Sequence, residues 1–113
     1  MGNSDRIRED VGLTVHVEQD GEGLVIRPVG ELDLSNTQKL DAELRGAIKD
    51  GTSEVILDLG GLSFIDSSGL RLLVFATAMS QANGNRLRML RGSAPVERVI
   101  QLTGLDGSLP FIN

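Results

Sequence analysis

A continuous apolar run followed by a helical pattern most constrains the fold of this chain. Val55-Ile56-Leu57 is typical of a strand in a parallel sheet, covered on both sides. A short loop follows, and apolar residues then recur at helical spacing over residues 67–82, where Asn83-Gly84-Asn85 closes the segment. A strand that leads directly into a helix predicts a β-α unit in the domain.

Sequence to the N-terminal side of this unit predicts a hairpin and a first helix. Residues 13–17 and 24–29 are expected to pair across a glycine-containing turn, and Pro28 predicts a free side, a bulge or an early end in the second strand. Ser35 is a plausible cap for the helix that follows, which Asp50-Gly51 ends. Its buried face is expected to hold Leu40, Leu44, Ala47 and Ile48.

The C-terminal third repeats the alternation. Residues 86–91 predict a strand, residues 94–103 a helix, and residues 109–112 one short last strand. The predicted order is β-β-α-β-α-β-α-β, an α/β class with one mixed, mainly parallel sheet. This single domain spans residues 11–113, and residues 1–10 are expected to form a flexible arm.

The helix predicted over residues 67–82 carries two apolar stripes. One contains Leu70, Leu73 and Val74, and the other contains Leu72 and Phe75. Core packing between neighbouring elements explains both stripes most simply. A partly exposed protein-binding face is the alternative.

Composition excludes several classes of function. The 113 residues include no cysteine, which excludes disulfides and thiolate chemistry and is compatible with a reducing compartment. A net charge of −5 argues against nucleic-acid binding. No apolar run approaches the roughly 20 residues of a spanning helix. We therefore expect a cytoplasmic protein that binds no cofactor, no metal and no nucleic acid and does not insert into membranes.

The side chains that catalysis requires are missing from the pattern. The only histidine, His16, lies in the first hairpin, far in sequence from Ser67 and Ser68, so neither serine has an identifiable general base. Asp58 follows a strand but lacks the acidic pair and the lysine of a phosphoacceptor site, and we expect it to be solvated or to bond a turn. The sequence does not predict an enzyme.

Three motifs carry a resemblance over residues 11–112. Gly30-Glu31-Leu32-Asp33 follows the second strand, Asp58-Leu59 follows the buried strand, and Ser63-Phe64-Ile65-Asp66-Ser67-Ser68-Gly69-Leu70 enters a helix. With these motifs the chain resembles the STAS family, and specifically the bacterial anti-sigma factor antagonists. The last motif is the specific one.

The resemblance implies a phosphorylation switch. In that family the serine directly before the glycine, here Ser68, is phosphorylated by a partner that is both anti-sigma factor and serine kinase. The unphosphorylated antagonist binds the kinase and releases the sigma factor, phosphorylation ends the binding, and a PP2C-type phosphatase restores it. ATP and magnesium would belong to the kinase. The expected contact surface comprises Gly30, Glu31, Asp33, Ser35, Asp66, Ser67, Ser68, Gly69 and Arg71.

Simpler roles stay open for several of these residues. Asp66 or Ser67 can cap the helix, and Asp33 can bond a turn. Arg71 is close enough to contact a phosphate on Ser68 or a carboxylate of the partner, or it is an ordinary exposed arginine. A phosphate would meet free amides and the positive dipole end at the helix start, so we expect little refolding.

Two other functions stay open as well. The chain can be a constitutively bound accessory subunit of a membrane transport complex, as STAS-like domains are in some transporters, or a sensor of a small ligand. Family members commonly continue into a further C-terminal helix, whereas this sequence stops at Asn113. Either the last strand and the surface that such a helix covers are exposed, or the sequence is a shortened one, and the oligomeric state is left open.

Overall fold

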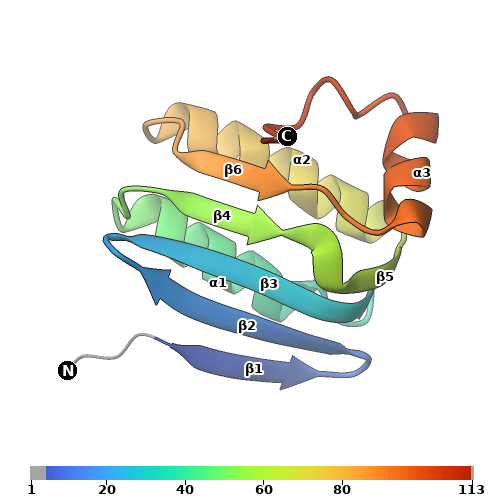
Figure 1. The fold of residues 1–113 in the computed structure, drawn as a ribbon, viewed down its shortest axis with the longest axis horizontal. Coiled ribbons are helices and arrows are strands. Elements are labelled where there is room, and N and C mark those ends of the chain that lie inside the picture. The colour runs from blue at the N-terminus through green and yellow to red at the C-terminus, as the bar shows by residue number, and fades with distance from the viewer. Residues whose placement is uncertain (1–4, 113) are drawn as a thin grey trace.

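The computed structural model describes residues 5–112 and has one mixed sheet with two helices behind it (Figure 1). The strands are β1 (Arg6–Asp10), β2 (Leu13–Asp20), β3 (Gly23–Leu32), β4 (Val55–Asp58), β5 (Leu62–Ile65) and β6 (Leu87–Leu90). The helices are α1 (Thr37–Lys49), α2 (Ser67–Ala82) and α3 (Ala94–Leu102), and the 3-10 helix η1 (Leu59–Gly61) joins β4 to β5. The α/β class is confirmed, and α2 has the predicted bounds.

The sheet has the strand order β1-β2-β3-β4-β6, and β5 pairs with β3 outside this path. β1, β2 and β3 are antiparallel neighbours, whereas β4 and β5 pair parallel to β3, and β6 pairs parallel to β4. Pro28 lies between the part of β3 that pairs with β4 and the part that pairs with β5. Its missing amide therefore interrupts no parallel ladder, as expected for proline in a strand.

One hydrophobic core lies between the sheet and the helices. The four α1 residues predicted to be buried, Leu40, Leu44, Ala47 and Ile48, are all buried. Alternate residues of β2 and β4, among them Val15, Val17 and Leu57, meet them from the sheet. The alternation follows from the period of two in a strand, which turns every second side chain to the same face.

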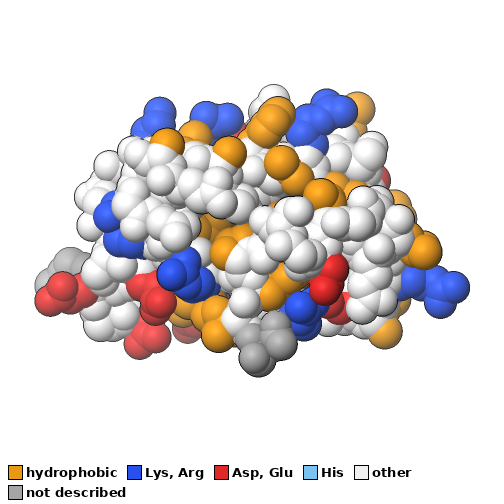
Figure 2. All heavy atoms as spheres, turned by 90° about the horizontal axis from the view of Figure 1, so that it is seen from above, with side chains coloured by type: hydrophobic (Ala, Val, Ile, Leu, Met, Phe, Trp, Pro, Cys, Tyr) orange, Lys and Arg blue, Asp and Glu red, His pale blue; other side chains and the backbone are white. Residues whose placement is uncertain are grey.

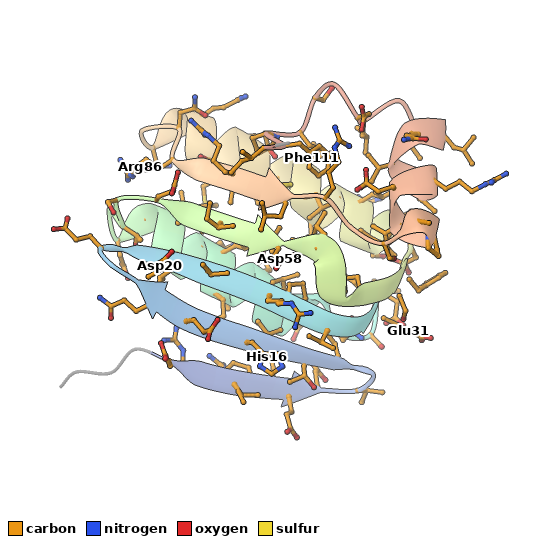
Figure 3. All side chains as sticks on the ribbon, viewed as in Figure 1. His16, Asp20, Glu31, Asp58, Arg86 and Phe111 are labelled. Carbon is orange, nitrogen blue, oxygen red and sulfur yellow. The ribbon has the colours of Figure 1, made fainter. Side chains whose placement is uncertain are left out.

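The opposite face of the sheet is largely open (Figure 3). Ile56 on this face is only half-buried, so the expectation that residues 55–57 are covered on both sides is wrong. His16 lies here as a surface residue of β2. Asp58 accepts a hydrogen bond from the Gly60 amide at 2.8 Å, and its carboxylate is 3.6 Å from Arg27 Nε. Asp58 therefore bonds a turn, as predicted.

Residues 6–10 differ from the expectation of a flexible arm over residues 1–10. They form the edge strand β1, which pairs with β2 from Arg6↔Val17 to Asp10↔Leu13. Arg6 and Arg8 both contact the carboxylate of Glu43 on α1, with 2.7 Å between Arg8 Nη1 and Glu43 Oε2. Ion pairs to a buried carboxylate thus fix this strand to α1. Residues 1–4 lie outside the described part of the chain.

The C-terminal segment is fixed to β6 and α3 by Arg91. Its guanidinium binds Glu97 at 2.8 Å and Asp106 at 2.6 Å, and lies 4.3 Å from the centre of the Phe111 ring. The hydrogen bonds that Arg91 donates to Asp106, and secondly to Glu97, raise the pKa of Arg91 above its usual value. The predicted last strand is reduced to a single bridge between Met89 and Phe111.

The face that carries β6 and the C-terminal segment mixes apolar and basic side chains. In the view from above, hydrophobic groups lie among Lys and Arg, and acidic groups lie mainly in the lower half (Figure 2). This agrees with the sequence, in which residues 67–113 carry two acidic and five basic side chains and residues 1–66 carry fourteen and six. Within residues 5–112 no helix is long and apolar enough to cross a bilayer.

Candidate functional site

The start of α2 is capped by Asp66. Its backbone is extended, with φ −105°, and its Oδ1 accepts a hydrogen bond from the Gly69 amide at 3.0 Å. The Asp66 carbonyl accepts from the Leu70 amide at 3.0 Å. A carboxylate at this position also interacts favourably with the positive end of the helix dipole. The capping role considered for Asp66 is confirmed.

Ser67 and Ser68 occupy the first two positions of α2. Ser67 is exposed and Ser68 is half-buried, and neither hydroxyl makes a hydrogen bond with another group in residues 5–112. The first amides of a helix have no acceptor within the helix, so this end can accommodate an anion. Ser68 therefore presents a hydroxyl that no internal bond restrains, at a place where added negative charge is tolerated.

The loop before α1 and the start of α2 converge. The Leu34 amide donates to Asp66 Oδ2 at 3.3 Å, and the Asp66 amide donates to the Leu32 carbonyl at 3.1 Å. The Ser63 hydroxyl donates to the Gly30 carbonyl at 3.2 Å. These bonds bring the Gly30–Asp33 motif beside the Ser63–Leu70 motif, which are more than thirty residues apart in the sequence.

Asp33 and Ser35 form a tight turn in this loop. Asp33 Oδ1 accepts from the Ser35 amide at 2.9 Å and from the Ser35 hydroxyl at 2.6 Å. Ser35 is therefore not the helix cap, because its side chain is bonded to Asp33 and α1 begins two residues later. Asn36 occupies the N-cap position but makes no side-chain cap bond. The turn-bonding role considered for Asp33 is confirmed.

Asn36, which the sequence analysis did not single out, holds this loop in place. It is fully buried, its Oδ1 accepts from the Asp33 amide at 2.9 Å, and its Nδ2 donates to the carbonyls of Val11 at 2.7 Å and Glu31 at 2.8 Å. The β1–β2 turn that contains Val11 thus becomes part of the same surface. An Asn close to an expected helix start is ambiguous in sequence, because it also favours turns and caps.

Glycine is required at two positions of this surface. Gly30 has φ +121°, and a Cβ there would lie 2.3 Å from the Gly12 carbonyl oxygen. A Cβ on Gly69 would lie 2.6 Å from Ile65 Cγ1, so glycine lets α2 approach β5 closely. Gly30 and Gly69 therefore shape the surface through the backbone.

Glu31 and Arg71 are both exposed. Glu31 precedes Asp66 in the sequence, and Arg71 follows it. Glu31 donates its amide to the Gly12 carbonyl at 2.9 Å, so its side chain is presented by a fixed strand end. Arg71 is on α2, three positions after Ser68, and makes no ion pair within residues 5–112. Side chains spaced three apart on a helix have Cβ atoms about 5–6 Å apart.

Within the described residues 5–112 the surface holds no metal-binding constellation. In the part of the chain that the structure describes, no group of three or more His, Cys, Asp or Glu side chains could hold a metal ion. His16 projects from the open face of the sheet, on a strand that carries none of the candidate residues (Figure 3). Within residues 5–112 the Ser68 hydroxyl therefore has no hydrogen-bonded side chain that could act as its general base.

Comparison with known proteins assigns the family. The model of the STAS domain matches residues 14–113. The chain belongs to the STAS domain family. An anti-sigma F factor antagonist of Lysinibacillus sphaericus is 38% identical over 85 residues, which cover 74% of this STAS domain chain and 73% of that protein. An anti-sigma-B factor antagonist of Staphylococcus aureus is 33% identical over 95 residues, covering 84% and 88%.

Solved structures give the same result for this STAS domain. The anti-sigma factor antagonist SpoIIAA in its unphosphorylated form matches with a TM-score of 0.72 and 30% identity, covering 88% of each chain. The Bacillus cell fate determinant SpoIIAA in its phosphorylated form matches with a TM-score of 0.66 and 30% identity, covering 88% of this chain and 91% of that one. The two curated relatives and this unphosphorylated structure are all anti-sigma factor antagonists.

Proposed function

We propose that this STAS domain is an anti-sigma factor antagonist that is switched by phosphorylation of Ser68. In its unphosphorylated form it binds an anti-sigma factor that is also a serine kinase, and the sigma factor is released. Phosphorylation by that kinase ends the binding, and a PP2C-type phosphatase restores it. The protein would act in the cytoplasm, where its partners regulate transcription, and it would need no cofactor of its own.

One observation carries this proposal: Ser68 is a half-buried serine at the start of a capped helix, on a surface built from three converging segments, and its hydroxyl makes no hydrogen bond within residues 5–112. A phosphate there adds about −1.5 to −2 charges and three acceptor oxygens. The amides of the helix start can bind these oxygens locally. The effect of the phosphate then falls on the contact surface and leaves the fold in place.

Neighbouring carboxylates support release of the partner after phosphorylation. Asp66 caps the same helix, and Asp33 lies in the loop that bonds to Asp66 through Leu34. A phosphate on Ser68 adds to the negative potential of both. An interface that fits a neutral hydroxyl would then have to bury uncompensated charge, which is unfavourable.

Phosphate mapping tests the proposal. The purified domain is incubated with ATP and each anti-sigma factor kinase of the same genome, and mass spectrometry locates the modified residue. We expect phosphate on Ser68 with one of these kinases, retention of that kinase by Ser68→Ala, and an unchanged reaction in the control Ser53→Ala, at an exposed serine outside the contact surface. Absence of phosphate on Ser68, combined with equal binding by wild type and Ser68→Asp, would reject the proposal.

A further inference from the structure

A groove of about 230 Å³ runs between α1 and α2 and reaches the candidate site. Its residues come from the loop before α1, from α1 and from the first turns of α2, and Ser68 is one of them. Pockets that hold small ligands measure about 300–1,000 Å³. The volume of this groove therefore suits a side chain of a protein partner better than a separate ligand.

The groove has three apolar lining residues among polar ones, and two of the three are exposed. Leu34 is 77% exposed and Phe75 is 55% exposed, and both line the groove, whereas Leu72, which also lines it, is only 5% exposed. Single exposed apolar residues are common on protein surfaces. Here two of them border one groove, and the Leu34 amide is fixed by its bond to Asp66. The arrangement is a fixed slot with a buried apolar floor.

The charges around the groove are unequal. On α1, Asp41 and Arg45 neutralise each other, with 2.7 Å between Asp41 Oδ2 and Arg45 Nε. On α2, Arg71 lines the groove and makes no ion pair in residues 5–112. A guanidinium without an internal partner is suited to a bidentate bond with a carboxylate. The groove therefore favours a partner that carries an acidic residue next to an apolar one.

We propose that the occupant of this groove is a segment of the anti-sigma factor kinase that inserts one large apolar side chain between Leu34 and Phe75 and offers a carboxylate to Arg71. The inference rests on the proposed function and names the chemistry by which the partner is recognised. It agrees with the general pattern of interfaces, in which a few anchors seated in pockets carry most of the affinity.

The groove also connects recognition to the phosphorylation switch. Ser68 and Arg71 both line it, so a phosphate on Ser68 lies within reach of the Arg71 guanidinium. The phosphate then pairs with the Arg71 guanidinium, which the carboxylate of the partner would otherwise bind. It also adds negative charge at the end of the groove. Release of the kinase follows from competition within this surface, without a change of fold.

Affinity measurements on matched variants test the groove. The probe is the purified kinase that phosphorylates the wild-type domain on Ser68, and the variants are Leu34→Ala, Phe75→Ala and Arg71→Glu. We expect each to weaken binding roughly tenfold or more, as truncation of an anchor commonly does. Arg71→Lys, which keeps the charge, should lose less than Arg71→Glu.

The chain offers matched controls that do not line the groove. Leu102 on α3 has the same 77% exposure as Leu34, and Val74 on α2 is 37% exposed but does not line the groove. Leu102→Ala, Val74→Ala and the charge control Arg98→Glu should bind like wild type. All six positions changed in these variants are exposed in the wild-type domain. Thermal melts show whether each variant is folded. If Leu34→Ala or Phe75→Ala is unfolded, Leu34→Ser or Phe75→Leu takes its place.

The outcomes separate the two proposals. If Leu34→Ala and Phe75→Ala bind and are phosphorylated like wild type, the groove is not the recognition site, although the proposed function stands. If no kinase binds or phosphorylates the wild-type domain, both proposals fail. If sedimentation shows that Phe75→Ala dissociates a dimer while kinase binding is unchanged, a second copy occupies the groove and the inference is overturned.

Discussion

At the scale of single residues, Asp66 joins the helix start to the neighbouring loop. One carboxylate oxygen caps Gly69 and the other accepts from Leu34. We predict that Asp66→Ala lowers the free energy of unfolding by about 1–2 kcal/mol, the usual cost of losing a cap. Asp66→Asn should restore most of this stability, because Asn is an equally good cap. Urea denaturation measures both, and equal stability of Asp66→Ala and wild type would contradict the capping role.

Two glycines in helices allow a comparison of packing with helix propensity. A Cβ on Gly69 meets Ile65 Cγ1 at 2.6 Å, whereas a Cβ on Gly46 of α1 meets nothing within 4 Å. Gly46→Ala should therefore raise the unfolding free energy by about 0.5–1 kcal/mol. Gly69→Ala should lower it by about 1–3 kcal/mol, since it overpacks the contact between α2 and β5. Thermal unfolding of the two variants tests this, and changes of the same sign would contradict it.

At the scale of elements, β1 depends on the buried carboxylate of Glu43. The Glu43 side chain is only 4% exposed, whereas those of Arg6 and Arg8 are 47% and 42% exposed. Glu43→Gln leaves two half-exposed arginines whose guanidinium groups can be solvated. It should therefore lower the free energy of unfolding by about 1 kcal/mol. The double variant Arg6→Ala/Arg8→Ala leaves a buried charge without these partners, and should cost about 3–5 kcal/mol. Chemical denaturation ranks the two, and a larger loss in Glu43→Gln would contradict the account.

The sequence predicts an element best where capping or turn residues mark both of its ends. Residues 67–82 were predicted as a helix with the observed bounds, because Asp66 caps its start and Asn83-Gly84 follows its end. The sequence predicts a loop where the structure has β5, since the side chains of β5 do not alternate between buried and exposed and its partner β3 ends thirty residues earlier. The sequence does not predict β1, because a short, charged segment gives no apolar signal; pairing with β2 and ion pairs with Glu43 hold this strand in place.

The candidate site was predictable where a motif carried it. Ser68, Asp66 and the loop from Gly30 could be named from the sequence and lie together in the structure. The contribution of Asn36 and of the β1–β2 turn could not be named, because it depends on hydrogen bonds between segments distant in sequence. Similarly, periodicity assigned Phe75 to an apolar stripe but could not tell that it would stay 55% exposed.

At the scale of the whole molecule, phosphorylation of Ser68 should act without refolding. The chain matches the phosphorylated and the unphosphorylated form of the same relative, with TM-scores of 0.66 and 0.72. We predict that phosphorylation shifts amide resonances in residues 33–36 and 64–75 and leaves those of β1 and α3 in place. Two-dimensional NMR of both forms measures this. Shifts spread evenly across the sheet would contradict a local switch.

The affinity of the kinase for the two forms of this domain tests the central claim most directly. Titration calorimetry compares the unphosphorylated domain with the domain phosphorylated only on Ser68, against the kinase that modifies it. We predict that phosphorylation weakens binding at least about thirtyfold, since an unpaired charge buried in an interface costs on the order of 2 kcal/mol or more. Equal dissociation constants for the two forms would contradict the claim that Ser68 is the switch.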